Sequence, residues 1–197
     1  KPVEFTLTLR IPGSAASASV DGEAAEPGSL VTLKRVWEGK SVVALSLGFE
    51  TTFVRRPTGL YSLERGPLVY ALKIGEDWTK LEYERGGVER KFPYCDWEVR
   101  PTTEWQYAFD GLDPEKIEIE EKGETGELPF APENAPCILK VPVRQINWGY
   151  ESEYRMVARA EPLSAMPVGP EKTAAFIPYG CTDIRLTELP EVDIPEA

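Results

Sequence analysis

The chain has 197 residues, and its hydrophobic fraction of 42% is typical of a folded globular protein with a real core. Its formal net charge of -11 argues against a nucleic-acid partner, because nucleic-acid binders concentrate Lys and Arg on one face. No apolar run approaches the roughly 18 residues of a membrane-spanning helix, so we expect no membrane partner either.

Residues 1–74 have the pattern of short antiparallel strands. Apolar and polar side chains alternate over residues 3–10 (VEFTLTLR), which predicts a half-buried strand. Asp21 and Gly22 form a dipeptide favoured in tight hairpin turns, because both positions adopt positive φ readily. Further strands are predicted at residues 30–34, 41–47 and 51–56. Strands of this length and spacing indicate a sandwich rather than a parallel sheet.

A domain boundary is predicted near residue 75. The apolar run at residues 68–74 is typical of a central strand buried on both faces. The following residues, 75–134, are polar, rich in aromatics and punctuated by prolines, with weak periodicity. We therefore predict a β-sandwich domain over residues 1–74, incomplete at its N-terminus, and a second sandwich domain with long loops over residues 75–197.

The second half of the chain predicts further strands. Alternation indicates strands at residues 117–120 and 137–146, with Pro142 at an edge or a bulge. Residues 161–171 contain three prolines and are expected to connect to the last two strands. No segment shows helical periodicity over three turns. The predicted fold is all-β, an antiparallel, jelly-roll-like sandwich with two small sandwich domains stacked together.

The residue types available for chemistry are restricted. The chain contains no histidine, which excludes Ser-His-Asp and Cys-His catalysis within it. Cys95, Cys137 and Cys181 lie far apart without a Cys-x-x-Cys pair, so neither a disulfide framework nor a zinc site is predicted. Acidic pairs such as Asp96 and Glu98 are expected in turns or salt bridges. We predict no catalytic residue, no metal ligand and no cofactor in this chain.

Five tryptophans raise the question of sugar binding, because aromatic faces stack on the C–H-rich faces of sugar rings. Packing in a core or a domain interface is the commoner role of tryptophan. Trp148 stands in a turn-like segment after a long predicted strand, with Tyr150 close by. These two residues are the candidate carbohydrate-binding residues.

Three landmarks stand in the chain in a fixed order. They are residues 65–72 (RGPLVYAL), residues 96–108 (DWEVRPTTEWQYA) with residues 129–136 (PFAPENAP), and residues 175–190 (AFIPYGCTDIRLTELP). In this order they resemble the C-terminal β-sandwich region of glycoside hydrolase family 127-like proteins, the bacterial β-L-arabinofuranosidase-like proteins. The resemblance covers nearly the whole chain and omits the helical barrel of that family. One departure is Ser14, which follows Ile-Pro-Gly where the family usually has tryptophan.

The resemblance implies a parent glycoside hydrolase that cleaves L-arabinofuranosyl or related bonds in plant-derived glycans. It places a cysteine nucleophile and a zinc ion, held by cysteines and a glutamate, in the (α/α) barrel upstream, and none of the three cysteines here matches those motifs. The implied role of this chain is that of a non-catalytic accessory region that packs against the barrel or shapes it. Two alternatives stay open: a carbohydrate-binding module for a plant-derived glycan, and a scaffold or homodimerisation domain without ligand.

The compartment of the protein is left open. Residues 1–5 carry no signal-peptide pattern and run directly into a predicted strand, as expected of an internal fragment. The odd cysteine count favours a cytoplasmic location.

Overall fold

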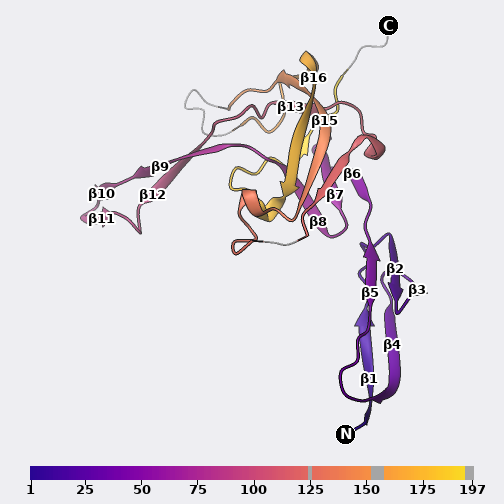
Figure 1. Cartoon of the computed structure of the whole chain (residues 1–197). Helices are drawn as coiled ribbons and strands as arrows, with labels where there is room; N and C mark the ends of the chain where they lie inside the picture. Colours follow the sequence, from indigo (N-terminus) through magenta and orange to yellow (C-terminus); the bar gives the residue numbers. More distant parts are fainter. Residues whose placement is uncertain (124–125, 152–157, 194–197) are drawn as a thin grey trace. The chain divides into compact units, whose positions relative to one another are not determined.

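The computed structural model describes residues 1–123, 126–151 and 158–193 (Figure 1). Its strands are β1 (Val3–Arg10), β2 (Ser17–Val20), β3 (Glu23–Ala25), β4 (Leu30–Trp37), β5 (Leu45–Gly48), β6 (Thr51–Arg55), β7 (Tyr61–Arg65), β8 (Leu68–Leu72), β9 (Glu76–Leu81), β10 (Tyr83–Arg85), β11 (Val88–Arg90), β12 (Asp96–Pro101), β13 (Tyr107–Phe109), β14 (Glu118–Glu121), β15 (Cys137–Asn147), β16 (Ser164–Pro178) and β17 (Glu188–Leu189). Three short 3-10 helices complete the assignment: η1 (Pro114–Lys116), η2 (Pro132–Asn134) and η3 (Tyr179–Cys181).

The prediction of an all-β, antiparallel fold is confirmed. The described residues contain no α-helix, and the ten strand pairs for which a register is given are all antiparallel. Within the same residues, no helix has the length and apolar character needed to cross a membrane. The arrangement is consistent with a sandwich-like fold.

The chain divides into two compact units. Unit 1 comprises Lys1–Thr52 and Glu64–Leu68, and unit 2 comprises Phe53–Leu63 and Val69–Ala197. These divisions fall elsewhere than residue 75. Whether residues 1–74 and 75–197 fold as separate sandwich domains stays a prediction.

Unit 1 contains two small sheets. One is the β1–β4 pair, and the other has the strand order β3-β2-β5. The predicted hairpin at Asp21 and Gly22 is confirmed: it joins β2 to β3, and both residues have positive φ, 50° and 86°. The strand predicted at residues 41–47 is shorter than expected, because β5 begins only at Leu45.

Unit 2 is built on an eight-stranded sheet that curls back on itself. Its main path runs β13-β15-β16-β8-β7-β17, while β14 pairs with β15 and β6 pairs with β7. The two ends of this path meet at Phe109 of β13, whose amide donates to the carbonyl of Pro190 at 2.8 Å. In return, the Phe109 carbonyl accepts from the amide of Val192 at 3.0 Å. These bonds connect the first strand of the path to the segment after the last one.

The curled sheet encloses the core of unit 2. The predicted central strand is confirmed as β8, which lies between β7 and β16 with Tyr70, Ala71 and Leu72 buried. Phe109 and Phe176 are fully buried, with their ring centroids 5.6 Å apart. Alternation along β15 turns every second side chain into this core, as a strand period of two requires.

Prolines in the long strands occupy positions where no amide hydrogen is needed. The prediction of Pro142 at an edge or a bulge is wrong, because β15 is an interior strand and Pro142 is in register with Thr173 of β16; on its other side it stands between the segments that pair with β14 and with β13. The connection predicted at residues 161–171 is wrong for most of its length, because β16 begins at Ser164. This half of β16 pairs with β15 on one side only, since β8 pairs with residues 176–178. Such a half-paired strand tolerates proline.

A long hairpin arm emerges from unit 2 in a region whose sequence has weak periodicity. β9 pairs with β12, and the shorter β10–β11 hairpin follows between them (Figure 1). Gly86 and Gly87, both with positive φ, make the turn at its tip. The arm exposes much of its aromatic surface to solvent.

Candidate functional site

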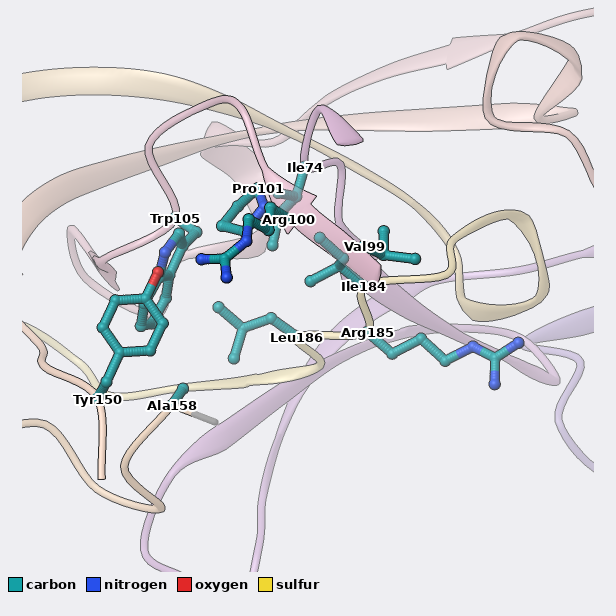
Figure 2. Close-up of a pocket in the computed structure, with 10 residues that line it drawn as sticks. All are labelled: Ile74, Val99, Arg100, Pro101, Trp105, Tyr150, Ala158, Ile184, Arg185 and Leu186. Carbon is teal, nitrogen blue, oxygen red and sulfur yellow. The ribbon is translucent and has the colours of Figure 1, made fainter. Parts of the chain in front are cut away.

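A small cavity lies where the arm joins the sheet of unit 2. Its volume is about 190 Å³. It is lined from β12 and the segment after it, from the segment around Tyr150, and from the loop between η3 and β17 (Figure 2). The lining residues are Ile74, Val99, Arg100, Pro101, Trp105, Tyr150, Ala158, Ile184, Arg185 and Leu186.

Aromatic rings form one wall of this cavity. The rings of Trp105 and Tyr150 meet edge to face with centroids 5.4 Å apart. Trp148 packs against Trp105 at 5.9 Å, and its indole Nε1 donates to the carbonyl of Arg159 at 2.9 Å. Because Trp105 and Trp148 are only 5% and 4% exposed, the core itself holds this wall in position.

Two arginines border the cavity in different ways. Figure 2 shows the guanidinium of Arg100 directed toward the aromatic wall and the side chain of Arg185 directed away from it. Arg100 forms an ion pair with Glu98 at 2.6 Å, and this carboxylate raises the pKa of the guanidinium. Arg185 instead lies over the ring of Tyr179, 4.6 Å from its centroid, and Nε donates to the carbonyl of Thr182 at 3.0 Å.

Glu76, the first residue of β9, connects the arm to the floor of the cavity. One carboxylate oxygen accepts the amide hydrogens of Asp183 at 3.2 Å and Ile184 at 2.8 Å. The other accepts from the indole Nε1 of Trp78 at 3.0 Å. A single side chain thus orients both a tryptophan of the arm and a loop that lines the cavity.

The arm carries an exposed aromatic pair on the face that also carries Val99, whereas Arg100 lies on the opposite face of β12. Trp78 is opposite Val99 in the β9–β12 register, and Trp97 is opposite Lys80. Directly opposed residues share a face of an antiparallel pair, so both tryptophans lie on the face of Val99, which lines the cavity. The two indoles are 47% and 44% exposed, with centroids 6.1 Å apart.

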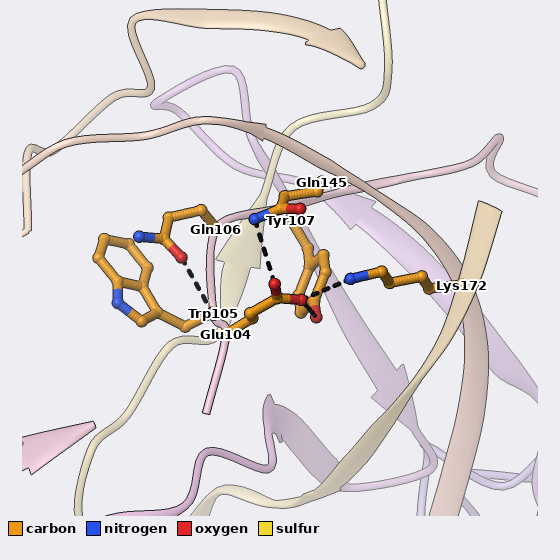
Figure 3. A network of polar contacts seen from close by, with 6 residues as sticks. All are labelled: Glu104, Trp105, Gln106, Tyr107, Gln145 and Lys172. Atoms are coloured by element: carbon orange, nitrogen blue, oxygen red, sulfur yellow. Dashed lines mark hydrogen bonds and ion pairs between the residues drawn. The ribbon is translucent and has the colours of Figure 1, made fainter. Parts of the chain in front are cut away.

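A second polar cluster lies on the segment that precedes β13. The carboxylate of Glu104 accepts from Lys172 Nζ at 2.5 Å, from the Tyr107 hydroxyl at 3.0 Å and from Gln145 Nε2 at 3.5 Å (Figure 3). Lys172 and then Tyr107 lower the pKa of Glu104. Burial, followed by the Glu104 hydrogen bond, raises the pKa of Tyr107 to about 12. The cluster connects this segment to β15 and β16. The lowered pKa of Glu104 and the raised pKa of Tyr107 keep the first ionised and the second protonated, which favours a structural role for their hydrogen bond.

The cysteines and acidic pairs lie in structural surroundings. Cys137 and Cys181 are buried, as expected of small apolar side chains, and burial raises the pKa of the Cys181 thiol. Asp96 accepts a hydrogen bond from the Tyr83 hydroxyl. Across the described residues, no group of three Cys, Asp or Glu side chains is arranged to hold a metal ion.

The two predicted sugar-binding residues differ in their access to the cavity. Tyr150 lines the cavity, whereas Trp148 lies behind Trp105. Sugar binding by this pair stays a prediction. Sequence reasoning missed Arg100, Trp105 and Leu186, because they come from segments whose approach depends on the tertiary fold. The Gly-Gly pair at the arm tip is the one local signal that points to a hairpin there.

Comparisons with known proteins give matches among solved structures alone. No family model matches the chain, and no curated protein matches it. The crystal structure of a GH127 β-L-arabinofuranosidase from Geobacillus stearothermophilus T6 is similar at 18% identity and a TM-score of 0.49, over 95% of this chain and 26% of that one. A structure described as a glycoside hydrolase is similar at 20% identity and a TM-score of 0.49, over 96% and 28%. The chain thus spans little more than a quarter of their length, and we transfer no functional residue from them.

Proposed function

We propose that this chain is a non-catalytic accessory region of a glycoside hydrolase that resembles β-L-arabinofuranosidases. In this proposal the chain packs against the (α/α) barrel of that protein through one face of the β1–β4 pair. The observation that carries the proposal is the apolar character of this face, which no core of unit 1 covers.

The register of β1 and β4 defines the face. Opposed residues share a face, and seven of the eight side chains on this one are apolar. They are Val3, Phe5, Leu7 and Leu9 on β1 and Val31, Leu33 and Trp37 on β4, with Arg35 as the one charged member. We call these eight residues the hairpin face.

Two of the seven apolar side chains of the hairpin face are exposed, and the other five are partly exposed. Val3 is 56% and Phe5 is 48% exposed, although Phe5 stacks on Trp37 with ring centroids 5.0 Å apart. A two-stranded sheet is marginally stable alone, because it cannot bury a face without a second layer. Contiguous apolar surface of this kind usually marks an interaction site.

The landmarks of residues 65–72, 96–108 and 175–190 support a barrel as the occupant of this face. In the resembled family the nucleophile and the zinc ion belong to that barrel. The proposal therefore assigns hydrolysis of L-arabinofuranosyl or related bonds to the parent protein, and packing to this chain. A homodimer through the hairpin face is the alternative that the same surface allows.

The test co-expresses this chain with a tagged (α/α) barrel from the coding region upstream in the same gene. We expect co-purification, and we expect Phe5→Glu to abolish it, because the change removes an apolar ring and places a carboxylate, opposite Arg35, in the apolar contact. Thr6→Glu is the matched control, since Thr6 lies on the opposite face of β1. Equal co-purification of both variants would contradict the proposal.

Two further measurements separate the alternatives. Sedimentation of the chain alone detects a homodimer, and a dimer lost in Phe5→Glu would replace the barrel by a second copy. Assays of the purified chain with aryl L-arabinofuranosides should show no turnover. Turnover would overturn the non-catalytic role.

A further inference from the structure

We propose that the cavity bounded by Trp105, Tyr150 and Leu186 binds one neutral sugar residue at the end of a glycan. Trp78 and Trp97 then contact the sugar residue next to it. This site belongs to unit 2 and does not depend on the hairpin face of unit 1.

The size of the cavity limits the ligand to a single ring. Its volume is about 190 Å³, whereas cavities of about 150 Å³ hold one benzene ring. A five- or six-membered sugar ring therefore fits, and a second ring must lie outside. The cavity is thus suited to a chain end rather than to the middle of a glycan.

The lining matches the two-sided chemistry of a sugar. Tyr150 supplies an aromatic surface for a C–H-rich ring face, with the largely buried Trp105 supporting it, and Ile184 and Leu186 add aliphatic groups. Arg100 adds hydrogen-bond donors directed into this apolar space (Figure 2). Ligand sites typically combine a mostly apolar lining with a few such polar groups.

The charge around Arg100 favours a neutral ligand over an anion. Glu98 already pairs with its guanidinium at 2.6 Å, which leaves little net positive charge for a carboxylate or a phosphate. The chain as a whole carries a formal charge of -11, which repels anions further. The remaining N–H groups of the guanidinium can still donate to hydroxyl oxygens.

The exposed tryptophans are fixed relative to the cavity rather than loosely attached near it. Trp78 donates to Glu76, and the same carboxylate holds the amide of Ile184, which lines the cavity. Trp97 packs edge to face on Trp78. A glycan whose last residue enters the cavity can therefore continue over this aromatic pair.

The experiment is calorimetric titration of the purified chain with methyl glycosides of arabinose, xylose, galactose and glucose, and with linear trisaccharides of the same sugars. Sodium benzoate serves as an anionic ring of similar size. We expect saturable binding of at least one sugar, tighter for its trisaccharide, and no binding of benzoate.

Variants locate the binding. Arg100→Met keeps the aliphatic stem but removes the donors, and should weaken binding about tenfold or more. Leu186→Phe fills the cavity and should abolish binding. Trp78→Ala should weaken the trisaccharide alone, and leave the methyl glycoside unchanged. Tyr94→Ala is the control, because Tyr94 is an exposed aromatic residue of the arm outside the cavity lining.

The outcomes are decisive in both directions. No binding of any sugar at millimolar concentration, or binding that survives both Arg100→Met and Leu186→Phe, overturns the site. Benzoate binding in place of sugar overturns the neutral ligand class. Because the side chain of Arg100 is half exposed, Arg100→Met keeps the test valid if Leu186→Phe fails to fold. Co-purification with the barrel is measured separately, so this proposal and the accessory role can fail independently.

Discussion

Both units consist of strands with alternating apolar and polar residues, but they differ in how far their apolar side chains are buried. Unit 2 curls an eight-stranded sheet around a continuous cluster of buried side chains. Unit 1 consists of two small sheets, and its buried apolar residues are Ile11, Ala15 and Val20. Alternating sequence therefore makes strands in both units, whereas a core forms where enough strands close over one another.

Hydrogen exchange is the most direct way to test this difference. Amides of β15 and β16 should exchange about a thousandfold more slowly than those of β1 and β4, because local opening of unit 1 exposes little buried surface. Exchange followed by mass spectrometry on peptides of both regions measures the ratio. Equal protection of the two regions would mean that the hairpin face is covered in solution, for example by a second copy.

Truncation of one phenylalanine in each unit gives the next largest contrast. Phe176→Ala should lower the free energy of unfolding by about 3–5 kcal/mol, because the ring is fully buried against Phe109. Phe5→Ala should cost less than about 1 kcal/mol, since half of the ring already lies in water. Urea unfolding followed by tryptophan fluorescence measures both. Similar losses would refute the claim that unit 1 lacks a core.

Backbone turns should matter more than side-chain burial in unit 1. Gly66 has φ 57°, and an added Cβ would collide with the ring of Phe49. We expect Gly66→Ala to cost about 1–3 kcal/mol in unfolding free energy.

Gly39→Ala is the matched control for this substitution. Gly39 has φ 62° but open space around its Cα, so the difference between the two variants isolates the steric contribution of Phe49. Thermal unfolding monitored by circular dichroism checks the pair. A larger loss of stability for Gly39→Ala than for Gly66→Ala would contradict the steric role of Phe49.

The smallest effect concerns pH. The Glu104 pKa is lowered in the folded state, mainly by Lys172, so its contribution to stability is present above the unfolded pKa of about 4.5 and is lost as pH falls through the folded value. The raised pKa of Tyr107 affects stability at alkaline pH. Its contribution to stability is present below the unfolded pKa of about 10 and is lost as pH rises through the folded pKa of about 12.

The midpoint temperature of thermal unfolding should therefore fall more steeply between pH 6 and 3 for the native chain than for Glu104→Gln. Glu4, whose ion pair with Lys34 in unit 1 is exposed, supplies the control variant Glu4→Gln. An equal change in the slope of midpoint temperature against pH in both variants would show that the net charge of the chain, rather than the Glu104 cluster, determines how stability falls in acid.

Local patterns account for much of the fold. The Asp21-Gly22 hairpin and the central β8 follow from turn chemistry and from apolar periodicity, both of which act over a few residues. The sequence around Pro167 predicts a connection, whereas β16 accommodates this proline because one side of the strand is unpaired there. The turn-like sequence around Trp148 likewise does not reveal that its side chain is buried.

The sequence by itself determines the absence of histidine, the acidic charge and the antiparallel strands, because composition and period-two alternation are properties of the chain itself. The curled closure at Phe109 and the cavity beneath Arg100 belong to the tertiary structure alone. Trp105, Tyr150 and Leu186 approach one another from three distant segments, and no local preference encodes such a meeting. Long-range pairing of the strands brings them together around the cavity.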